Sequence, residues 1–134
     1  MSIPLASSYE IRCNTASRNQ PPKIPQIEIQ INICYALTMS MGGMLTQMIA
    51  LRHPERVCGI VLLSSMYFAA GAEIQAPALI IHGTEDVVIP CIHGEMLARA
   101  IPDSALYLME GAVYELNPQD YIPVAEQIVN RFAP

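Results

Sequence analysis

The sequence predicts an α/β domain in which a parallel sheet of about four strands is covered by helices on both faces. Two runs, VCGIVLLSS from Val57 to Ser65 and ALIIH from Ala78 to His82, are apolar at almost every position. Strands that are buried on both faces have this continuous character, which is typical of parallel sheets. Segments with helical periodicity alternate with these and other strand-like runs. The predicted order is strand, helix, strand, short link, strand, helix, strand, helix.

The N-terminal part of the chain divides into an arm and the first strand. Residues 1–26 are polar, contain several prolines and show little periodicity, so we expect an irregular arm. The following IEIQINI, from Ile27 to Ile33, alternates apolar and polar residues, as a strand with one solvated face requires. We expect this strand to continue into ICYAL. The chain therefore divides into an arm, residues 1–26, and a core, residues 27–134.

Three segments have the periodicity of helices. The first follows Ser40 and is ended by Pro54, and its apolar face contains Met44, Met48 and Leu51, with Leu45 and Ile49 beside them. The second is HGEMLARAI, which follows Pro90. The last is amphipathic and has apolar residues at Val124, Ala125, Ile128, Val129 and Phe132. The run ALYLM, residues 105–109, is predicted to be the strand between the second and third helices.

Composition excludes several classes of function. Seven basic and twelve acidic residues give a net charge of −5, and no cluster of Lys or Arg could neutralise several phosphates, so we expect no nucleic-acid partner. No apolar run approaches the roughly 20 residues of a membrane span, and the first residues do not have the pattern of a secretory signal. The four cysteines form no CxxC pair, which favours buried free thiols. We expect a cytoplasmic protein without a membrane association, metal or other cofactor, its methionines packing in the core.

The stretch TMSMGG, residues 38–43, joins the ICYAL strand directly to a helix. A serine at such a turn lies next to the free N–H groups and the positive end of the new helix. Small neighbours are required because the strand and the helix pass close together, and Thr38 and Gly42 flank Ser40 in this way. The pattern approximates the G-x-S-x-G nucleophile elbow, although an ordinary strand-to-helix turn can produce the same short match.

The longer context resembles the α/β-hydrolase fold, in particular its serine esterases and enol-lactonases. YALTMSMGGMLTQMIALRHPERVCGIVLLSS is similar to the elbow, the next helix and the next strand of that family, and APALIIHGTEDVVIP is similar to the strand and loop that carry its acidic residue. IPDSALYLMEGAVYELNPQD resembles the last strand and the loop that usually carries the catalytic histidine. The resemblance implies Ser40 as nucleophile, Asp86 as the acid, the backbone N–H of Met41 as an oxyanion donor, and an ester or lactone as substrate.

The chain departs from the family pattern at the catalytic base. The family's loop usually reads Gly-x-Gly-His, whereas Gly111 is followed here by AVYEL, so that Tyr114 stands at the position of the histidine. Tyrosine has an ordinary pKa of about 10 and can hardly accept the serine proton at neutral pH. Among the three histidines of the chain, His53 and His82 are expected to be structural or solvated. His93 is the least implausible substitute.

Two other parts of the family pattern are missing. The family has several strands and a second oxyanion donor before the elbow, and the link from Met66 to Pro77 is too short for its helical cap, so any pocket should be open and shallow. Two functions remain: a protein related to serine esterases with impaired or no hydrolase activity, or an active ester or lactone hydrolase that uses Ser40 and Asp86 with an unrecognised base. A third, ligand binding at the elbow as an anion site, has no specific support.

The resemblance also predicts a self-association. The strand that precedes the elbow strand in the family's sheet is missing, which leaves an apolar edge bare. Bare edges of this kind pair with other chains, and two copies related by a two-fold axis can join such strands antiparallel. We therefore expect a homodimer in which Ile27 to Leu37 pairs with the same segment of a second copy.

Overall fold

A computed structural model describes residues 34–68 and 70–133 of the chain. The principal elements are β1 (Cys34–Met39), α1 (Met41–Arg52), β2 (Val57–Leu63), β3 (Ala78–Gly83), α2 (Ile92–Ala100), β4 (Ser104–Met109) and α3 (Tyr121–Phe132). The predicted arm, residues 1–26, and the predicted strand Ile27 to Ile33 lie outside the described residues. None of the helices in the described ranges is long and apolar enough to cross a membrane.

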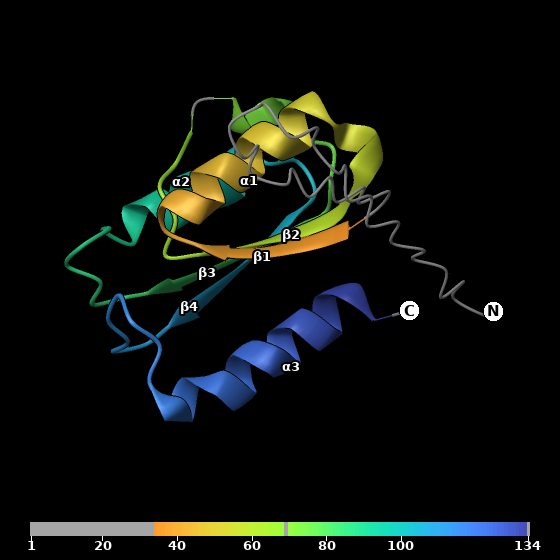
Figure 1. Cartoon of the computed structure of the whole chain (residues 1–134). Coiled ribbons are helices and arrows are strands. Elements are labelled where there is room, and N and C mark those ends of the chain that lie inside the picture. The colour runs from red at the N-terminus through yellow and green to blue at the C-terminus, as the bar shows by residue number, and fades with distance from the viewer. Residues whose placement is uncertain (1–33, 69, 134) are drawn as a thin grey trace, which may run out of the picture. The chain divides into compact units, whose positions relative to one another are not determined.

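The four strands form one parallel sheet in the order β1-β2-β3-β4. Helices α1 and α2 cover one face of this sheet, and α3 covers the other (Figure 1). Both central strands are almost entirely buried, as the apolar runs from Val57 and from Ala78 predicted. The α/β class and the element order expected from the sequence are therefore confirmed.

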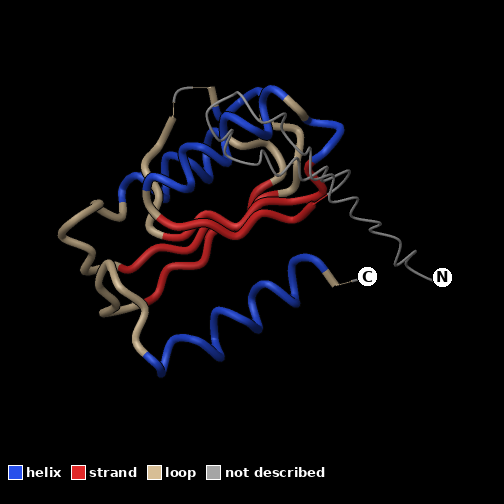
Figure 2. Tube along the Cα trace, in the orientation of Figure 1, coloured by secondary structure: helices blue, strands red, loops and turns tan. Residues whose placement is uncertain are grey.

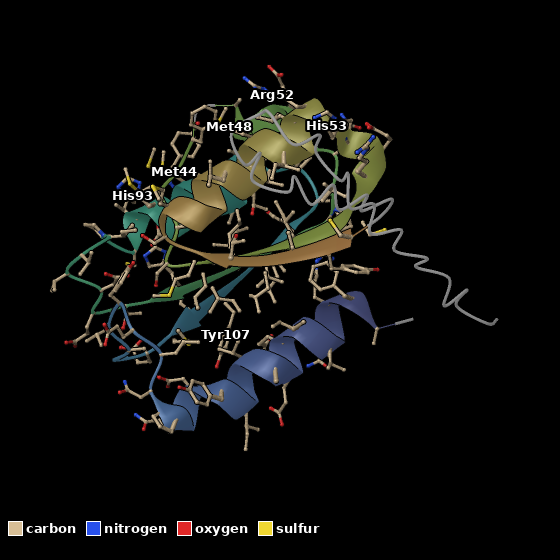
Figure 3. The ribbon with its side chains drawn as sticks, in the orientation of Figure 1. Met44, Met48, Arg52, His53, His93 and Tyr107 are labelled. Carbon is tan, nitrogen blue, oxygen red and sulfur yellow. The ribbon has the colours of Figure 1, made fainter. Side chains whose placement is uncertain are left out.

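The sheet lies between helices on its two faces (Figure 2). Alternating residues of its central strands supply two separate cores, one on each face. Ile60, Leu62 and Ile80 point towards α1 and α2, where they meet Leu97 and Ile101. The second core lies towards α3 and consists of Val61, Leu63, Leu79, Ile81, Met109, Ala112 and Val124. Tyr107 of β4 belongs to its border and extends towards α3 (Figure 3). The second core extends through Ala112 into the loop after β4.

The inner face of α1 differs from the apolar face that its periodicity indicated. The residues of α1 that are buried are Gly43, Thr46, Gln47 and Ala50. Leu45 and Ile49, by contrast, are more than half exposed. Both buried polar side chains find hydrogen-bond partners: Thr46 accepts from the Thr38 hydroxyl of β1 at 3.0 Å, and the Gln47 amide donates to the carbonyl of Met66 at 3.1 Å. Of their polar atoms, only Oε1 of Gln47 has no partner among the described residues.

In the described part of the link between β2 and β3, residues 71–73 form a short 3-10 helix, Gly71–Glu73. Ile74 and Ala76, which follow it, are buried in the core on the side of α1 and α2. A link without an α-helix is sufficient here because β2 and β3 are direct neighbours in the sheet.

Candidate functional site

The loops that follow the strands meet at the carboxyl edge of the sheet. The sheet hydrogen bonding continues there by one residue beyond each of three strands: the backbone N–H groups of Ser40, Ser64 and Thr84 donate to the carbonyls of Leu63, Ile81 and Met109 at 3.1, 2.9 and 3.1 Å. In open parallel sheets, ligands bind outside the carboxyl ends of the strands. Ser40 is therefore placed at the edge where a site is expected.

Ser40 occupies a strained turn between β1 and α1. Its φ of 56° and ψ of −124° lie in a region that residues other than glycine rarely adopt. The Ser40 side chain makes no hydrogen bond to cap the helix, and the hydroxyl of Ser65 donates to the Ser40 carbonyl at 3.3 Å. The N–H of Met41 belongs to the first turn of α1, where N–H groups have no intrahelical partner. This is the geometry expected of a nucleophile elbow.

At Gly43, the backbone of this turn packs closely against the side chain of Ser65. A Cβ atom at Gly43 would lie 2.0 Å from the Ser65 hydroxyl oxygen and 2.6 Å from its Cβ. A Cβ atom at Gly42, the flanking residue that the sequence pattern emphasised, would meet the nearest atom, Cβ of Thr38, at 3.4 Å. The sequence pattern therefore predicts the strand-to-helix turn but not the glycine at which the packing is tightest.

Replacing Gly43 by alanine is expected to lower the free energy of unfolding by about 1–3 kcal/mol, because the new methyl group displaces the Ser65 side chain from the start of α1. Gly42→Ala is the matched control: it has room for the methyl group and is expected to be neutral or stabilising by up to about 1 kcal/mol. Urea denaturation of the two variants measures the difference. Equal stabilities would show that Gly43 tolerates a side chain.

Asp86 lies in the loop between β3 and α2 and is buried. One of its carboxylate oxygens, Oδ1, accepts hydrogen bonds from the backbone N–H groups of Val88 and Ile89 at 2.9 and 2.8 Å. The other oxygen, Oδ2, has no hydrogen-bond partner among the described residues. The side chain is therefore held rigidly by its own loop, with one buried oxygen free.

His82, near the end of β3, is fully buried beside Asp86. Its Nε2 lies 2.7 Å from the carbonyl oxygen of Ile89 and 3.5 Å from Oδ2 of Asp86. A carbonyl can only accept, so Nε2 carries a hydrogen and donates it to Ile89. The ring packs directly under Gly94 of α2, where a Cβ atom would lie 2.9 Å from Nδ1 of His82. His82 thus holds the Asp86 loop against the sheet.

The loop after β4 brings Tyr114 to the same edge. The N–H of Glu85 donates to the carbonyl of Ala112 at 3.0 Å, which joins the loop after β3 to the loop after β4. The hydroxyl of Ser64 donates to the backbone carbonyl of Tyr114 at 3.4 Å. Ser64 follows β2 directly, and Ser40 follows the neighbouring β1, so the loops of Ser40, Asp86 and Tyr114 form one cluster.

The remaining histidines are poorly arranged to serve as a base for Ser40. Nδ1 of His93 accepts a hydrogen bond from the backbone N–H of Tyr67 at 3.3 Å. His53 follows the last turn of α1, at the far end of that helix from Met44 (Figure 3). The helix separates it from Ser40 by roughly 20 Å at the rise per residue of an α-helix. Within the described ranges, no group of three or more His, Cys, Asp or Glu residues could hold a metal ion.

Two shallow hollows of the described surface lie on α3 and not at Ser40. One, of about 520 Å³, is on the outer side of α3 around Tyr121 and Ile122. The other, of about 340 Å³, is a groove between α3 and β1 that Leu37 and Phe132 help to line. Neither hollow includes Ser40, Asp86 or Tyr114.

Comparison with solved structures reveals extensive similarity. A CIB-like hydrolase from Thermoplasma acidophilum matches 74% of this chain, with a TM-score of 0.67 and 22% sequence identity. A meta-cleavage product hydrolase from Pseudomonas fluorescens matches 76% of the chain, with a TM-score of 0.70 and 15% identity. An enol-lactonase from Burkholderia xenovorans matches 78% of the chain, with a TM-score of 0.69 and 16% identity. The chain spans 51%, 65% and 67% of the lengths of these three proteins. No protein-family model and no curated protein matches the sequence. At these identities the similarity shows a shared fold.

Proposed function

We propose that this chain, which has the α/β-hydrolase fold, is related to serine esterases but has little or no hydrolase activity. Ser40 and Asp86 are the remnants of the nucleophile and the acid, and Tyr114 replaces the histidine. The substrates named for the similar structures include an enol-lactone and a meta-cleavage product, and these belong to those proteins. For this chain, an ester or lactone is the class of ligand that the elbow would accept.

The free carboxylate oxygen of Asp86 is the observation that carries the proposal. In a serine hydrolase the acid orients the base by accepting a hydrogen bond from its ring. Here Oδ1 of Asp86 is occupied by the N–H groups of Val88 and Ile89, while the buried Oδ2 has no donor among the described residues. The only histidine near Oδ2 is His82, whose Nε2–H is already donated to the carbonyl of Ile89. The acid is thus retained without a base to orient.

The alternative, an active hydrolase with an unrecognised base, has weaker support. His93 is the best candidate, because it lies in the first turn of α2 and is only partly buried. With Nδ1 accepting from Tyr67, however, the neutral ring carries its hydrogen on Nε2, which then cannot accept the proton of Ser40. A base would have to break this hydrogen bond before each reaction.

The purified protein is expected to hydrolyse p-nitrophenyl acetate no faster than its Ser40→Ala variant, and a fluorophosphonate probe is expected to leave Ser40 unlabelled. General-base assistance contributes about 10²- to 10⁴-fold to such reactions. An oxyanion donor contributes a further 10²- to 10³-fold, roughly, and only the N–H of Met41 is recognisable as one. Without both contributions the serine hydroxyl remains an ordinary alcohol. Tyr114→His is expected to raise the rate only slightly, because the second donor would still be absent.

Strong labelling that disappears in Ser40→Ala would contradict the proposal and establish an active enzyme. Two further variants would then identify the base. If labelling disappeared in His93→Ala and survived in Tyr114→Phe, His93 would be the base. If labelling survived in His93→Ala and disappeared in Tyr114→Phe, the Tyr114 hydroxyl would be the base.

A further inference from the structure

The strand that carries the elbow lies at an edge of the sheet. In the described part of the chain, β1 pairs only with β2, so that the backbone N–H and C=O groups on its other side have no strand partner. Natural edge strands are usually protected by charged side chains, prolines or bulges that prevent pairing with another chain. The sequence of β1, CYALTM, contains no charge and no proline. Among residues 34–68 and 70–133, no further strand covers this edge.

Exposed apolar side chains flank this edge on both faces of the sheet. On the face of α3, Tyr35 and Leu37 are 62% and 59% exposed and border the apolar groove that also includes Val129 and Phe132. On the face of α1, Met41, Leu45 and Ile49 are 70%, 54% and 51% exposed and follow one another at helical spacing. Contiguous exposed apolar surface of this kind marks an interaction site.

The two edge strands of the sheet, β1 and β4, differ in the charged residues that lie beside them. From residue 34 to residue 51 the chain contains no acidic, basic or histidine residue, so two copies of this surface bring no like charges together. The other edge strand, β4, is flanked by Asp103 and Glu110. Its Leu106 and Leu108 side chains are each 38% exposed, less than Tyr35 and Leu37 on β1. Asp103 is paired with the guanidinium of Arg131, so charged side chains of both signs border the β4 edge. Charged side chains protect an edge strand from pairing, and residues 34–51 supply none at β1.

We propose that a second copy of this chain occupies the β1 edge, with the two β1 strands paired antiparallel around a two-fold axis perpendicular to the sheet. That axis keeps the same face of the sheet upward in both copies. The exposed residues of α1 then meet α1 of the second copy on one face, and the grooves beside α3 meet on the other. One interface thereby covers the bare strand and both apolar surfaces, and it does so independently of catalysis at Ser40.

The mass of the full chain in solution tests this inference. Light scattering or native mass spectrometry at micromolar concentration is expected to give twice the 14.7 kDa of one chain. Leu37→Lys is expected to raise the dissociation constant of the dimer by roughly 100-fold or more, because each dimer loses two buried leucines and gains two apposed charges. Leu108→Lys, the same change on the other edge strand, is the matched control and is expected to leave the dimer intact.

Hydrogen exchange of the unmodified protein gives a second measurement that needs no variant. The amides of β1 that point away from β2 are expected to be protected at micromolar concentration and to exchange on dilution. A monomer whose β1 amides exchange freely would overturn the proposal. A monomer with protected amides would overturn it as well, because the edge would then be covered by the chain itself. A dimer that Leu108→Lys disrupts and Leu37→Lys does not would place the interface at β4.

Discussion

Replacing Gly83 by alanine is expected to lower the free energy of unfolding by about 3 kcal/mol, a large part of the stability of a single domain. A Cβ atom at Gly83 would lie 2.3 Å from the carbonyl oxygen and 2.7 Å from the carbonyl carbon of Ala112. These are backbone atoms and cannot rotate out of the way as a side chain can. The loops after β3 and β4 would have to separate, which breaks the hydrogen bond from Glu85 to Ala112. Urea denaturation measures the loss.

Gly111→Ala is the matched control for this prediction, since it makes the same change in the same pair of loops. Gly111 has a φ of 70° and no atom within 4 Å of the added Cβ, so alanine there meets backbone strain without a steric clash. The expected loss is about 1–2 kcal/mol. If Gly83→Ala unfolds at the same urea concentration as the unmodified protein, or is more stable than Gly111→Ala, the loops are not packed against each other at Gly83.

The contact at Gly83 matters for the site because it aligns two loops that are distant in the sequence. Asp86 is carried by the loop after β3, and Tyr114 by the loop after β4. The absence of a side chain at Gly83 lets the backbone of Ala112 pass directly over the end of β3. The same two loops would have to be aligned in an active hydrolase for a histidine at residue 114 to reach the Asp86 carboxylate. Under the function that we propose, the chain retains the scaffold for this interaction and lacks the base.

The order of strands and helices could be predicted from the sequence because the signals are strong and local. The run from Val57 and the run from Ala78 are apolar on both faces, which is typical of a covered parallel sheet. The break between strand and helix at Ser40 could also be predicted, since β1 ends at Met39 and α1 begins at Met41. Each of these features depends on residues that are close together in the chain.

The details of packing could not be predicted, because they depend on partners that are distant in the sequence. Thr46 and Gln47 are polar, so a pattern of apolar residues does not place them against the sheet, yet their hydrogen bonds reach Thr38 and Met66. The hydroxyls of Ser64 and Ser65 donate to carbonyls that are 50 and 25 residues away, in the Tyr114 loop and at Ser40. The pairing of Ile27 to Ile33 concerns residues outside the described part and stays a prediction.

The function of His82 is a further case in which sequence proximity gives no guidance. His82 and Asp86 are four residues apart, but a strand end and a turn lie between them, so no helical or strand spacing predicts their contact. The structure places Nε2 of His82 between the Ile89 carbonyl and Asp86. The residue that sequence analysis set aside as structural or solvated is thus the buried support of the candidate acid.

His82→Ala is expected to lower the free energy of unfolding by about 2–4 kcal/mol. The change leaves a cavity beneath Gly94, removes the donor to the buried Ile89 carbonyl and takes the imidazole away from Asp86. Because the Asp86 loop loses its attachment to β3, the amides of Val88 and Ile89, which donate to Asp86, are expected to exchange faster with solvent. Urea denaturation gives the global effect, and hydrogen exchange gives the local one.

Two variants separate this support of the loop from a general loss of core packing. His82→Gln retains an N–H donor at a similar distance from the backbone and is expected to restore much of the protection at Val88 and Ile89. His53→Ala removes an imidazole whose side chain is 54% exposed, and is expected to change the free energy of unfolding by less than about 0.5 kcal/mol. Unchanged exchange at Val88 and Ile89 in His82→Ala would mean that Asp86 holds its loop without the histidine. The buried ring would then act only by filling space beneath α2.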